Sequence, residues 1–217
     1  MKHRYILFFL LSFFVICSNS QIHFDDFDGN SNITTWFGDD CNINLNLANP
    51  YQQGINASST VMQYHDVGGQ YANVRFDAGS SFALAENIFK LKIYIPSGSL
   101  TGNQPIQVSL KVQDGSLSFP WMTQSEIIKT LQLDQWQEVS FDFENDGYIN
   151  LDGSSPPPVT RTDFNRVVIQ VNGEGNSDNV IAYIDDFWYG ENTTVYEDPV
   201  YDNLVWSDEF NVDGPLD

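Results

Sequence analysis

The sequence predicts an all-β fold, a two-sheet antiparallel β-sandwich. Three observations carry this prediction. Between His23 and Gly190, short runs alternate between apolar and polar residues, and turn-forming Gly, Asn, Asp, Ser and Pro separate these runs. Helical periodicity is nearly absent. About 165 residues suffice for one such domain with a sizeable core.

Six segments show the clearest strand pattern, because every second residue in each of them is apolar. Successive side chains of a strand point to opposite faces, so these apolar residues share one face. In residues 89–95, for example, Phe89, Leu91 and Ile93 alternate with lysine and tyrosine. The apolar parities should meet in a core between the two sheets. In chain order, the six segments are residues 73–76, 89–95, 106–113, 138–143, 166–171 and 182–189.

Polar segments interrupt and end this pattern. Residues 150–162 contain three consecutive prolines, which lack the N–H that a central strand needs, so we expect a surface loop there. Residues 191–203 are polar and acidic, which is typical of a linker. We therefore place one β-sandwich domain at residues 21–190, a linker at 191–203 and the truncated start of another domain at 204–217.

Residues 1–20 have the order of a secretory signal peptide: a basic start, an apolar run to Ile16 and small polar residues up to Ser20. We expect cleavage near Ser20 and a secreted or outer-surface protein. Cys17 leaves lipid anchoring open, although the small residue usual just upstream of such a site is missing. Cleavage would leave Cys41 as the one remaining cysteine, so stability should come from an apolar core and not from an internal disulfide.

The chain is strongly acidic, with 29 Asp and Glu against 9 Lys and Arg. Such a field repels phosphate backbones and anionic headgroups, so we expect neither nucleic-acid binding nor membrane insertion. Soluble secreted proteins are often acidic without any functional consequence, so acidity by itself identifies no partner. We expect a monomer.

Several stretches resemble a known family. Residues 24–29 (FDDFDG) resemble the first strand of jelly-roll carbohydrate-binding modules, and residues 183–187 (YIDDF) resemble their closing strand. Between them, residues 135–143 look like the tryptophan-led strand common in these modules, followed by a strand like residues 163–169. The resemblance implies a jelly-roll sandwich that binds a polysaccharide, and a neutral glycan fits the acidic chain best.

Residues 204–217 look like the opening strand of family 16 glycoside hydrolases, especially laminarinases from marine Bacteroidetes. This resemblance implies a covalently linked glycosidase, an endo-β-1,3-glucanase, which the module would hold on laminarin. The family's catalytic signature, Glu-x-Asp-x-x-Glu, needs two carboxylates on one strand face. The nearest match, residues 144–149, ends in Ile149, and residues 144–147 have turn composition. We therefore expect no catalysis by this chain.

A sugar presents an apolar ring face and a rim of hydroxyls, so its site needs aromatic platforms beside amide and guanidinium groups. Alternation places Tyr71, Asn73 and Arg75 on one face of a strand, which makes that face the leading glycan-binding candidate. Gln113 and Gln170, together with Lys111, lie on the non-core parity of their own strands and could join it. The alternative is an ordinary solvated sheet face.

Trp121 and Trp36 lie in irregular segments, where no strand pattern enforces burial. Either ring could stack on a sugar or pack under a loop. Trp136 leads a strand with core residues, so we expect a structural role for it. Jelly-roll modules often carry a structural calcium where the first and last strands are neighbours, and hard oxygen ligands suit that ion. By this resemblance the ligands would be Asp26 or Asp28 with Asp186, although solvated or capping aspartates explain the same residues.

Together these features predict a non-catalytic module that binds β-glucan, most specifically β-1,3-glucan, and that targets an attached glycosidase to its polysaccharide. The alternative function is a structural spacer or a cell-surface adhesion domain without glycan affinity.

Overall fold

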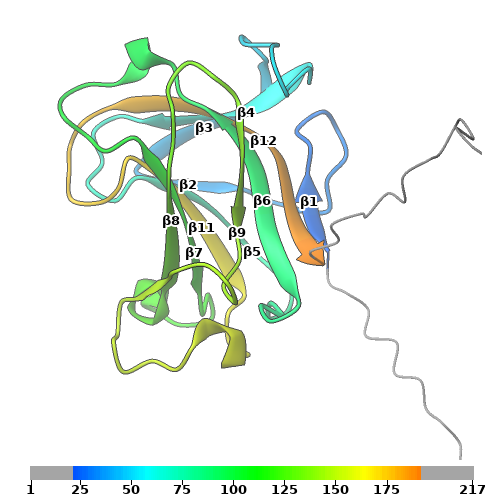
Figure 1. Cartoon of the computed structure of the whole chain (residues 1–217), viewed down its shortest axis with the longest axis vertical. Helices are drawn as coiled ribbons and strands as arrows, with labels where there is room; N and C mark the ends of the chain where they lie inside the picture. Colours follow the sequence, from blue (N-terminus) through cyan, green and yellow to red (C-terminus); the bar gives the residue numbers. More distant parts are fainter. Residues whose placement is uncertain (1–21, 192–217) are drawn as a thin grey trace, which may run out of the picture.

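Two antiparallel sheets of six strands each pack face to face in the computed structural model, which describes residues 22–191 (Figure 1). The first sheet has the strand order β3-β4-β12-β6-β9, with β1 paired to β12, and the second has the order β10-β8-β7-β11-β5-β2. The predicted all-β sandwich is therefore confirmed. The predicted signal peptide, Cys17, most of the linker and the family 16 segment lie outside the described residues.

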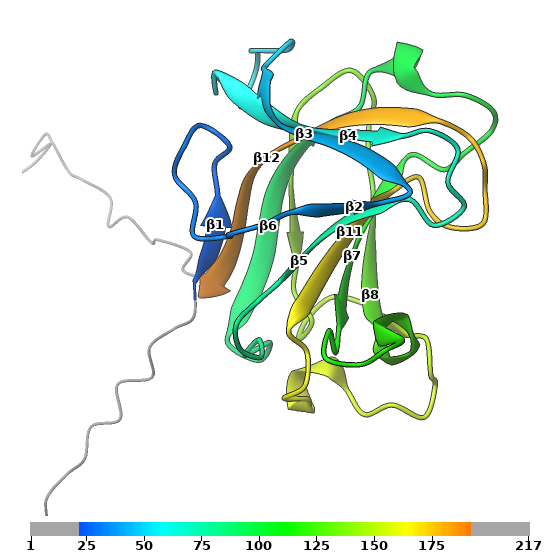
Figure 2. The same ribbon diagram turned by 180° about the vertical axis from the view of Figure 1, so that it is seen from behind.

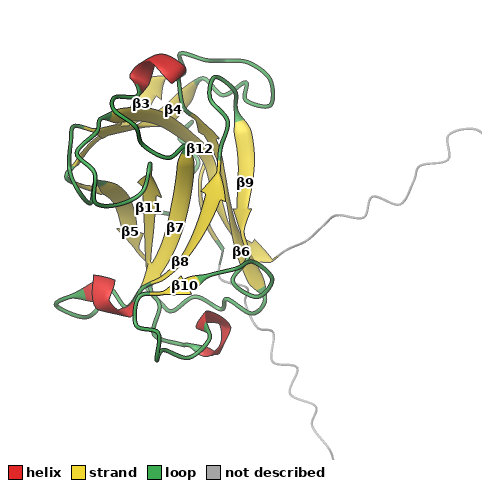
Figure 3. Ribbon diagram, turned by 60° about the vertical axis from the view of Figure 1, so that its left-hand side comes forward, coloured by secondary structure: helices red, strands yellow, loops and turns green. Residues whose placement is uncertain are grey.

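Within residues 22–191, the strands vary from two to twelve residues in length, and the helices are three short 3₁₀ turns at the ends of the sandwich (Figure 3). In chain order the elements are β1 (His23–Asp25), β2 (Phe37–Asp39), β3 (Cys41–Ala48), β4 (Thr60–Asp66), β5 (Asn73–Asp77), β6 (Asn87–Tyr94), η1 (Ser97–Ser99), β7 (Gln107–Gln113), η2 (Pro120–Thr123), β8 (Ser125–Thr130), β9 (Gln137–Phe141), β10 (Ile149–Asn150), η3 (Pro158–Thr160), β11 (Arg166–Val171) and β12 (Val180–Glu191). Among the described residues, no helix has the length and apolarity to cross a membrane.

The core lies between the sheets and is built from the predicted apolar parities. Phe89, Leu91 and Ile93 of β6 are fully buried, and so are Val74 and Phe76 of β5 in the facing sheet. All six predicted strands are present, with ends that differ by at most two residues. Their alternation therefore identified the buried face of both sheets.

Several strands were missed, and β3 shows why. Its apolar positions Ile43 and Leu45 pack against the core, but asparagine occupies every second position from Asn42 to Asn46. Asparagine disfavours strands and is typical of turns, so the segment has the composition of a loop. Pairing with β4 along most of its length supplies the ladder that local propensity does not.

The outward face of the first sheet carries a second apolar cluster, formed by Val61, Tyr94, Trp136 and Tyr183. Residues 49–59 cover this cluster. Tyr51 stacks on Tyr94 with ring centroids 4.2 Å apart, and its backbone oxygen accepts a 2.7 Å hydrogen bond from the Trp136 indole. The loop therefore closes this face of the sandwich, and Trp136 is buried as expected.

Candidate functional site

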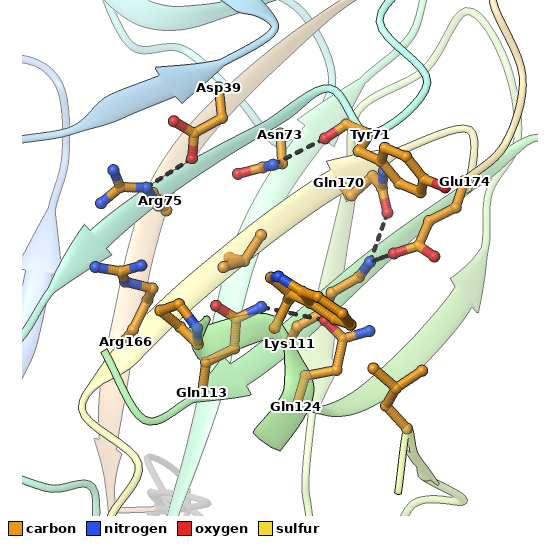
Figure 4. A pocket seen from close by; sticks show the side chains of 14 residues that line it. Asp39, Tyr71, Asn73, Arg75, Lys111, Gln113, Gln124, Arg166, Gln170 and Glu174 are labelled. Carbon is orange, nitrogen blue, oxygen red and sulfur yellow. Dashed lines mark hydrogen bonds and ion pairs between the residues drawn. The ribbon is translucent and has the colours of Figure 1, made fainter. Parts of the chain in front are cut away.

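The strands of the second sheet lie side by side in Figure 2. This sheet carries a groove on the face turned away from the core (Figure 4). The groove encloses about 570 Å³, which lies within the range of roughly 300–1,000 Å³ that ligand sites occupy. Its lining residues come from β2, β5, β11 and β7 and from loop segments, including residues just before β8 and just after β10. The lining residues are Asp39, Tyr71, Asn73, Arg75, Lys111, Gln113, Pro120, Trp121, Gln124, Leu151, Arg166, Val168, Gln170 and Glu174.

The strand register aligns one side chain from each of the six strands in a row across this face. From β2 to β10, the row consists of Phe37, Arg75, Val168, Lys111, Glu126 and Ile149. Neighbouring strands lie about 4.8 Å apart, so the row is roughly 24 Å long. The groove occupies the central part of this row, and its direction across the strands suits an extended chain better than a single small molecule.

Lys111 lies at the centre of the groove floor, and its side chain is only 4% exposed. Its ammonium group donates to Gln170 Oε1 at 2.7 Å, pairs with Glu174, and lies 3.6 Å from Glu126 Oε1. Two of the three N–H donors of the ammonium group are thus hydrogen-bonded, and the Glu126 carboxylate lies at ion-pair distance. Lys111 therefore links its strand to neighbouring parts of the floor, and its charge is compensated there.

The glutamines of the floor are oriented by their own hydrogen bonds. Because Gln170 Oε1 accepts from Lys111, its NH₂ group stays available to the groove. Gln113 Nε2 donates to Gln124 Oε1 at 3.1 Å, which leaves the Gln113 oxygen and the Gln124 NH₂ group. Asn73 Oδ1 is buried without a hydrogen-bond partner. The floor thus offers amide donors and acceptors in fixed directions.

The cations of the groove are compensated by carboxylates. Arg75 Nε lies 2.6 Å from Asp39 Oδ2, and a terminal nitrogen of Arg166 lies 3.0 Å from Asp77 Oδ2. With Lys111 and its two glutamates, three cations face four carboxylates in and beside the groove. The site is therefore polar without being a basic patch.

Two exposed aromatic side chains flank this polar floor. Tyr71, just before β5, is 58% exposed, and Trp121, on η2, is 54% exposed. The turn that carries Trp121 is held in place, because the Thr123 hydroxyl donates to Pro120 O and accepts from Asp114 N. Rings with one free face beside planar amides are the combination that sugar stacking requires.

The structure brings six of the seven predicted glycan-binding residues into this groove. They are Tyr71, Asn73, Arg75, Trp121, Gln113 and Gln170. Figure 4 shows Tyr71, Asn73, Arg75, Gln113 and Gln170 around Lys111. Their role in glycan binding stays a prediction.

The prediction of Trp36 as a stacking platform is wrong. Its ring is 5% exposed and packs edge-on against Phe76 and Phe187 in the core. Its indole N–H donates to Asp25 Oδ2 at 2.9 Å, so its polar atom is satisfied inside the protein. The segment before β2 is irregular but runs over the open end of the core, and this position buries the ring.

Sequence reasoning also missed part of the groove. Arg166 and Val168 share their strand face with Gln170, so strand parity could have found them. Gln124, Leu151 and Glu174 lie outside the predicted strands. No periodic pattern places residues of this kind, because loop paths depend on the packing of distant segments.

The predicted calcium ligands do not form a metal cluster. Within residues 22–191, no group of three or more acidic, histidine or cysteine side chains is arranged to hold a metal ion. Asp26 accepts hydrogen bonds from Asn30, Asp28 accepts from Ser59 and Thr60, and Asp186 pairs with Lys92 at 2.6 Å. A hydrogen bond from the Thr60 hydroxyl lowers the pKa of Asp28. These aspartates act as turn caps and ion-pair partners in the structure, and calcium binding by Asp26 or Asp28 with Asp186 stays a prediction.

A different carboxyl group is buried on the first sheet. Burial raises the pKa of Asp185 to about 6, and Asn56 donates to its Oδ2 at 2.6 Å. Asp185 lies under residues 49–59, on the covered face, and not in the groove. Burial also raises the pKa of the free Cys41 thiol to about 12, which disfavours the thiolate form at neutral pH.

No protein-family model matches the chain, and no curated protein does. Among solved structures, the chain is similar to the C-terminal family 22 carbohydrate-binding module of Clostridium thermocellum Xyn10B, with 16% identity, a TM-score of 0.47, and coverage of 81% of this chain and 95% of that one. It is also similar to the family 29 module CBM29-2 (14%, TM-score 0.45, 78% and 88%) and to an exo-β-agarase (10%, TM-score 0.52, 81% and 25%). The structural neighbours thus include β-sandwich carbohydrate-binding modules, and identities this low speak to the fold alone.

Proposed function

We propose that this protein is a non-catalytic glycan-binding module whose groove on the second sheet holds an extended neutral polysaccharide. The observation that carries the proposal is the groove itself. Two exposed rings, Tyr71 and Trp121, flank a floor of oriented amides that lies across the neighbouring strands of one sheet. Rings bury the apolar sugar face, and amides exchange hydrogen bonds with hydroxyl groups.

The proposed ligand is a β-glucan, with β-1,3-glucan of the laminarin type as the specific candidate. A neutral ligand is supported by the ion pairs of the groove, because Arg75, Arg166 and Lys111 are each paired with a carboxylate. An anionic chain would therefore find no free basic patch. The β-1,3 linkage is supported by the family 16 resemblance of residues 204–217. In this proposal a linked glycosidase follows the module, and the protein is secreted or held on the outer surface.

The absence of catalysis is supported by the state of the groove carboxylates. Asp39 is bound by Arg75, and Glu174 is bound by Lys111. Glycoside hydrolysis needs one carboxyl group that holds a proton beside another that is ionised. Both of these groove carboxylates are engaged in ion pairs, so neither is free to act as a member of such a pair. Release of reducing sugar by the purified protein would contradict this part of the proposal.

Isothermal titration with laminarin tests the binding function, with xylan, mannan and cellohexaose as comparators. We expect heat with laminarin and a change in tryptophan emission as Trp121 becomes covered. Binding of a comparator alone would reject the β-1,3 assignment and keep the glycan-binding function. No heat with any glycan would favour a structural spacer or adhesion domain.

A structural calcium ion bound by Asp26 or Asp28 with Asp186 stays a prediction. The ion would have to displace the side chains that engage these aspartates. If it does, a chelator such as EDTA should lower the thermal midpoint, and added calcium should restore it. An unchanged midpoint would reject the structural calcium.

A further inference from the structure

The β8–β10 end of the groove differs in chemistry from the rest of the face. Three aliphatic side chains lie exposed there: Ile128 of β8 is 40% exposed, Ile149 of β10 is 56% exposed, and Leu151, just after β10, is 51% exposed. We call these three residues the aliphatic shelf. Contiguous exposed apolar side chains at a sheet edge often mark an interaction site.

The shelf is continuous with the groove. Ile149 is paired directly with Glu126, whose carboxylate lies 3.6 Å from the Lys111 ammonium on the groove floor, so the Ile149 side chain points to the groove face. Ile128 is two residues from Glu126 on the same strand and shares that face. Leu151 itself lines the groove, and its N–H donates to Gln124 O at 3.1 Å. A chain that follows the cross-strand row therefore leaves the groove over the shelf.

The shelf has the wrong chemistry for an unsubstituted sugar. Its side chains offer neither a hydrogen-bonding group nor an aromatic face. A hydroxyl group buried against them would lose its bonds to water without replacement, which is unfavourable. A methyl group in the same place loses no hydrogen bond and removes apolar surface from water. The shelf thus favours a glycan with apolar decoration where the chain leaves the groove.

We propose that the aliphatic shelf binds methyl-bearing substituents, O-acetyl esters or O-methyl ethers, on the glycan held in the groove. This inference rests on the proposed function, since it needs a glycan in the groove to present the substituent. It adds a selectivity that neither the stacking rings nor the amides of the floor supply.

The test compares unsubstituted, partially O-acetylated and partially O-methylated preparations of laminarin and of xylan, titrated into the wild-type protein. One buried methyl group is worth roughly a fourfold gain in affinity. We therefore expect about fourfold tighter binding of a substituted preparation than of its parent. The acetylated and methylated arms show which substituent the shelf prefers.

Two variants, Ile128→Ser and Ile149→Ser, should abolish this gain while leaving the affinity for the unsubstituted glycan unchanged, because neither side chain lines the groove itself. Ile55→Ser is the matched control, because Ile55 is similarly exposed (53%) but lies in the loop over the other sheet. Thermal midpoints of all three should stay near wild type, since each side chain is exposed.

Equal affinity of the wild-type protein for substituted and parent glycans would overturn the shelf proposal and leave glycan binding intact. A gain that survives both serine substitutions would overturn it as well, because the substituent would then bind elsewhere. Failure to bind any preparation would reject the proposed function together with the shelf.

Discussion

The outward faces of the two sheets share an alternating pattern but differ in what covers them. On the first sheet, Tyr94, Trp136 and Tyr183 are buried under residues 49–59. On the second sheet, Tyr71 and Trp121 stay more than half exposed beside an open groove. Outward aromatic residues therefore do not mark a binding site by themselves. A site arises where no loop closes the face.

The covered face should matter for stability alone. Tyr94→Ala removes the ring that stacks on Tyr51 and contacts Trp136. We expect a loss of about 3 kcal/mol in the free energy of unfolding, the cost of a large buried aromatic, with glycan affinity unchanged. Urea unfolding and titration calorimetry measure the two quantities. A large loss of affinity in a folded Tyr94→Ala protein would show that the two faces are coupled.

The covered face should also be the pH-sensitive one. The pKa of Asp185 is about 6 in the folded protein, above its unfolded value near 4. Between about pH 4 and pH 6, the Asp185 carboxyl group is therefore more protonated in the folded state than in the unfolded state. The contribution of Asp185 to stability is complete below about pH 4 and declines as the pH rises to about 6, by roughly 2–3 kcal/mol.

Asp185→Asn should remove this decline, because the variant has no group to titrate. Midpoints of urea unfolding for both proteins at pH 4.5 and pH 7 provide the comparison. The wild type should lose stability relative to the variant on going to pH 7. Parallel behaviour of the two proteins would contradict burial of a titrating Asp185.

Lys111 is the groove residue whose loss should affect both stability and binding. Lys111→Met leaves Glu126 and the buried oxygen of Gln170 without their cation. Breaking a buried pair costs up to about 3–5 kcal/mol, and the partial exposure of Glu174 reduces this to roughly 2 kcal/mol. Affinity should fall as well, because the Gln170 amide loses its orientation.

An arginine at this position separates the two roles. Lys111→Arg keeps the charge but changes the geometry of its donors. We expect it to recover more stability than affinity. Equal recovery of both would indicate that Lys111 has only a structural role.

On the open face we expect the opposite of the Tyr94→Ala result, namely a loss of glycan affinity without a loss of stability. Trp121→Ala removes a ring platform and should weaken glycan binding about tenfold, or roughly 1.4 kcal/mol, with the thermal midpoint nearly unchanged. Phe119→Ala is the control, because Phe119 is 63% exposed near the same turn but does not line the groove. A sharp fall in the midpoint of Trp121→Ala would instead make Trp121 a structural residue.

Strand parity explains why much of the groove could be predicted. Asn73 and Arg75 alternate with Val74 and Phe76, so burial of the apolar pair places the polar pair outward. The same reasoning covers Gln113 and Gln170. Simple alternation fails along β12, because the β-bulge between Asp185 and Trp188 changes which residues face the core, from Ile184 before the bulge to Phe187 after it.

The sequence by itself determined the fold class, the core face of the main strands and the polar strand face that lines the groove. These features follow from side-chain alternation, which is a local property of a strand. Only the tertiary structure decided that Trp36 is buried, that residues 49–59 close one face, and that Gln124, Leu151 and Glu174 join the other. These outcomes depend on where irregular segments cross the sandwich, and such paths result from long-range packing that no local pattern encodes.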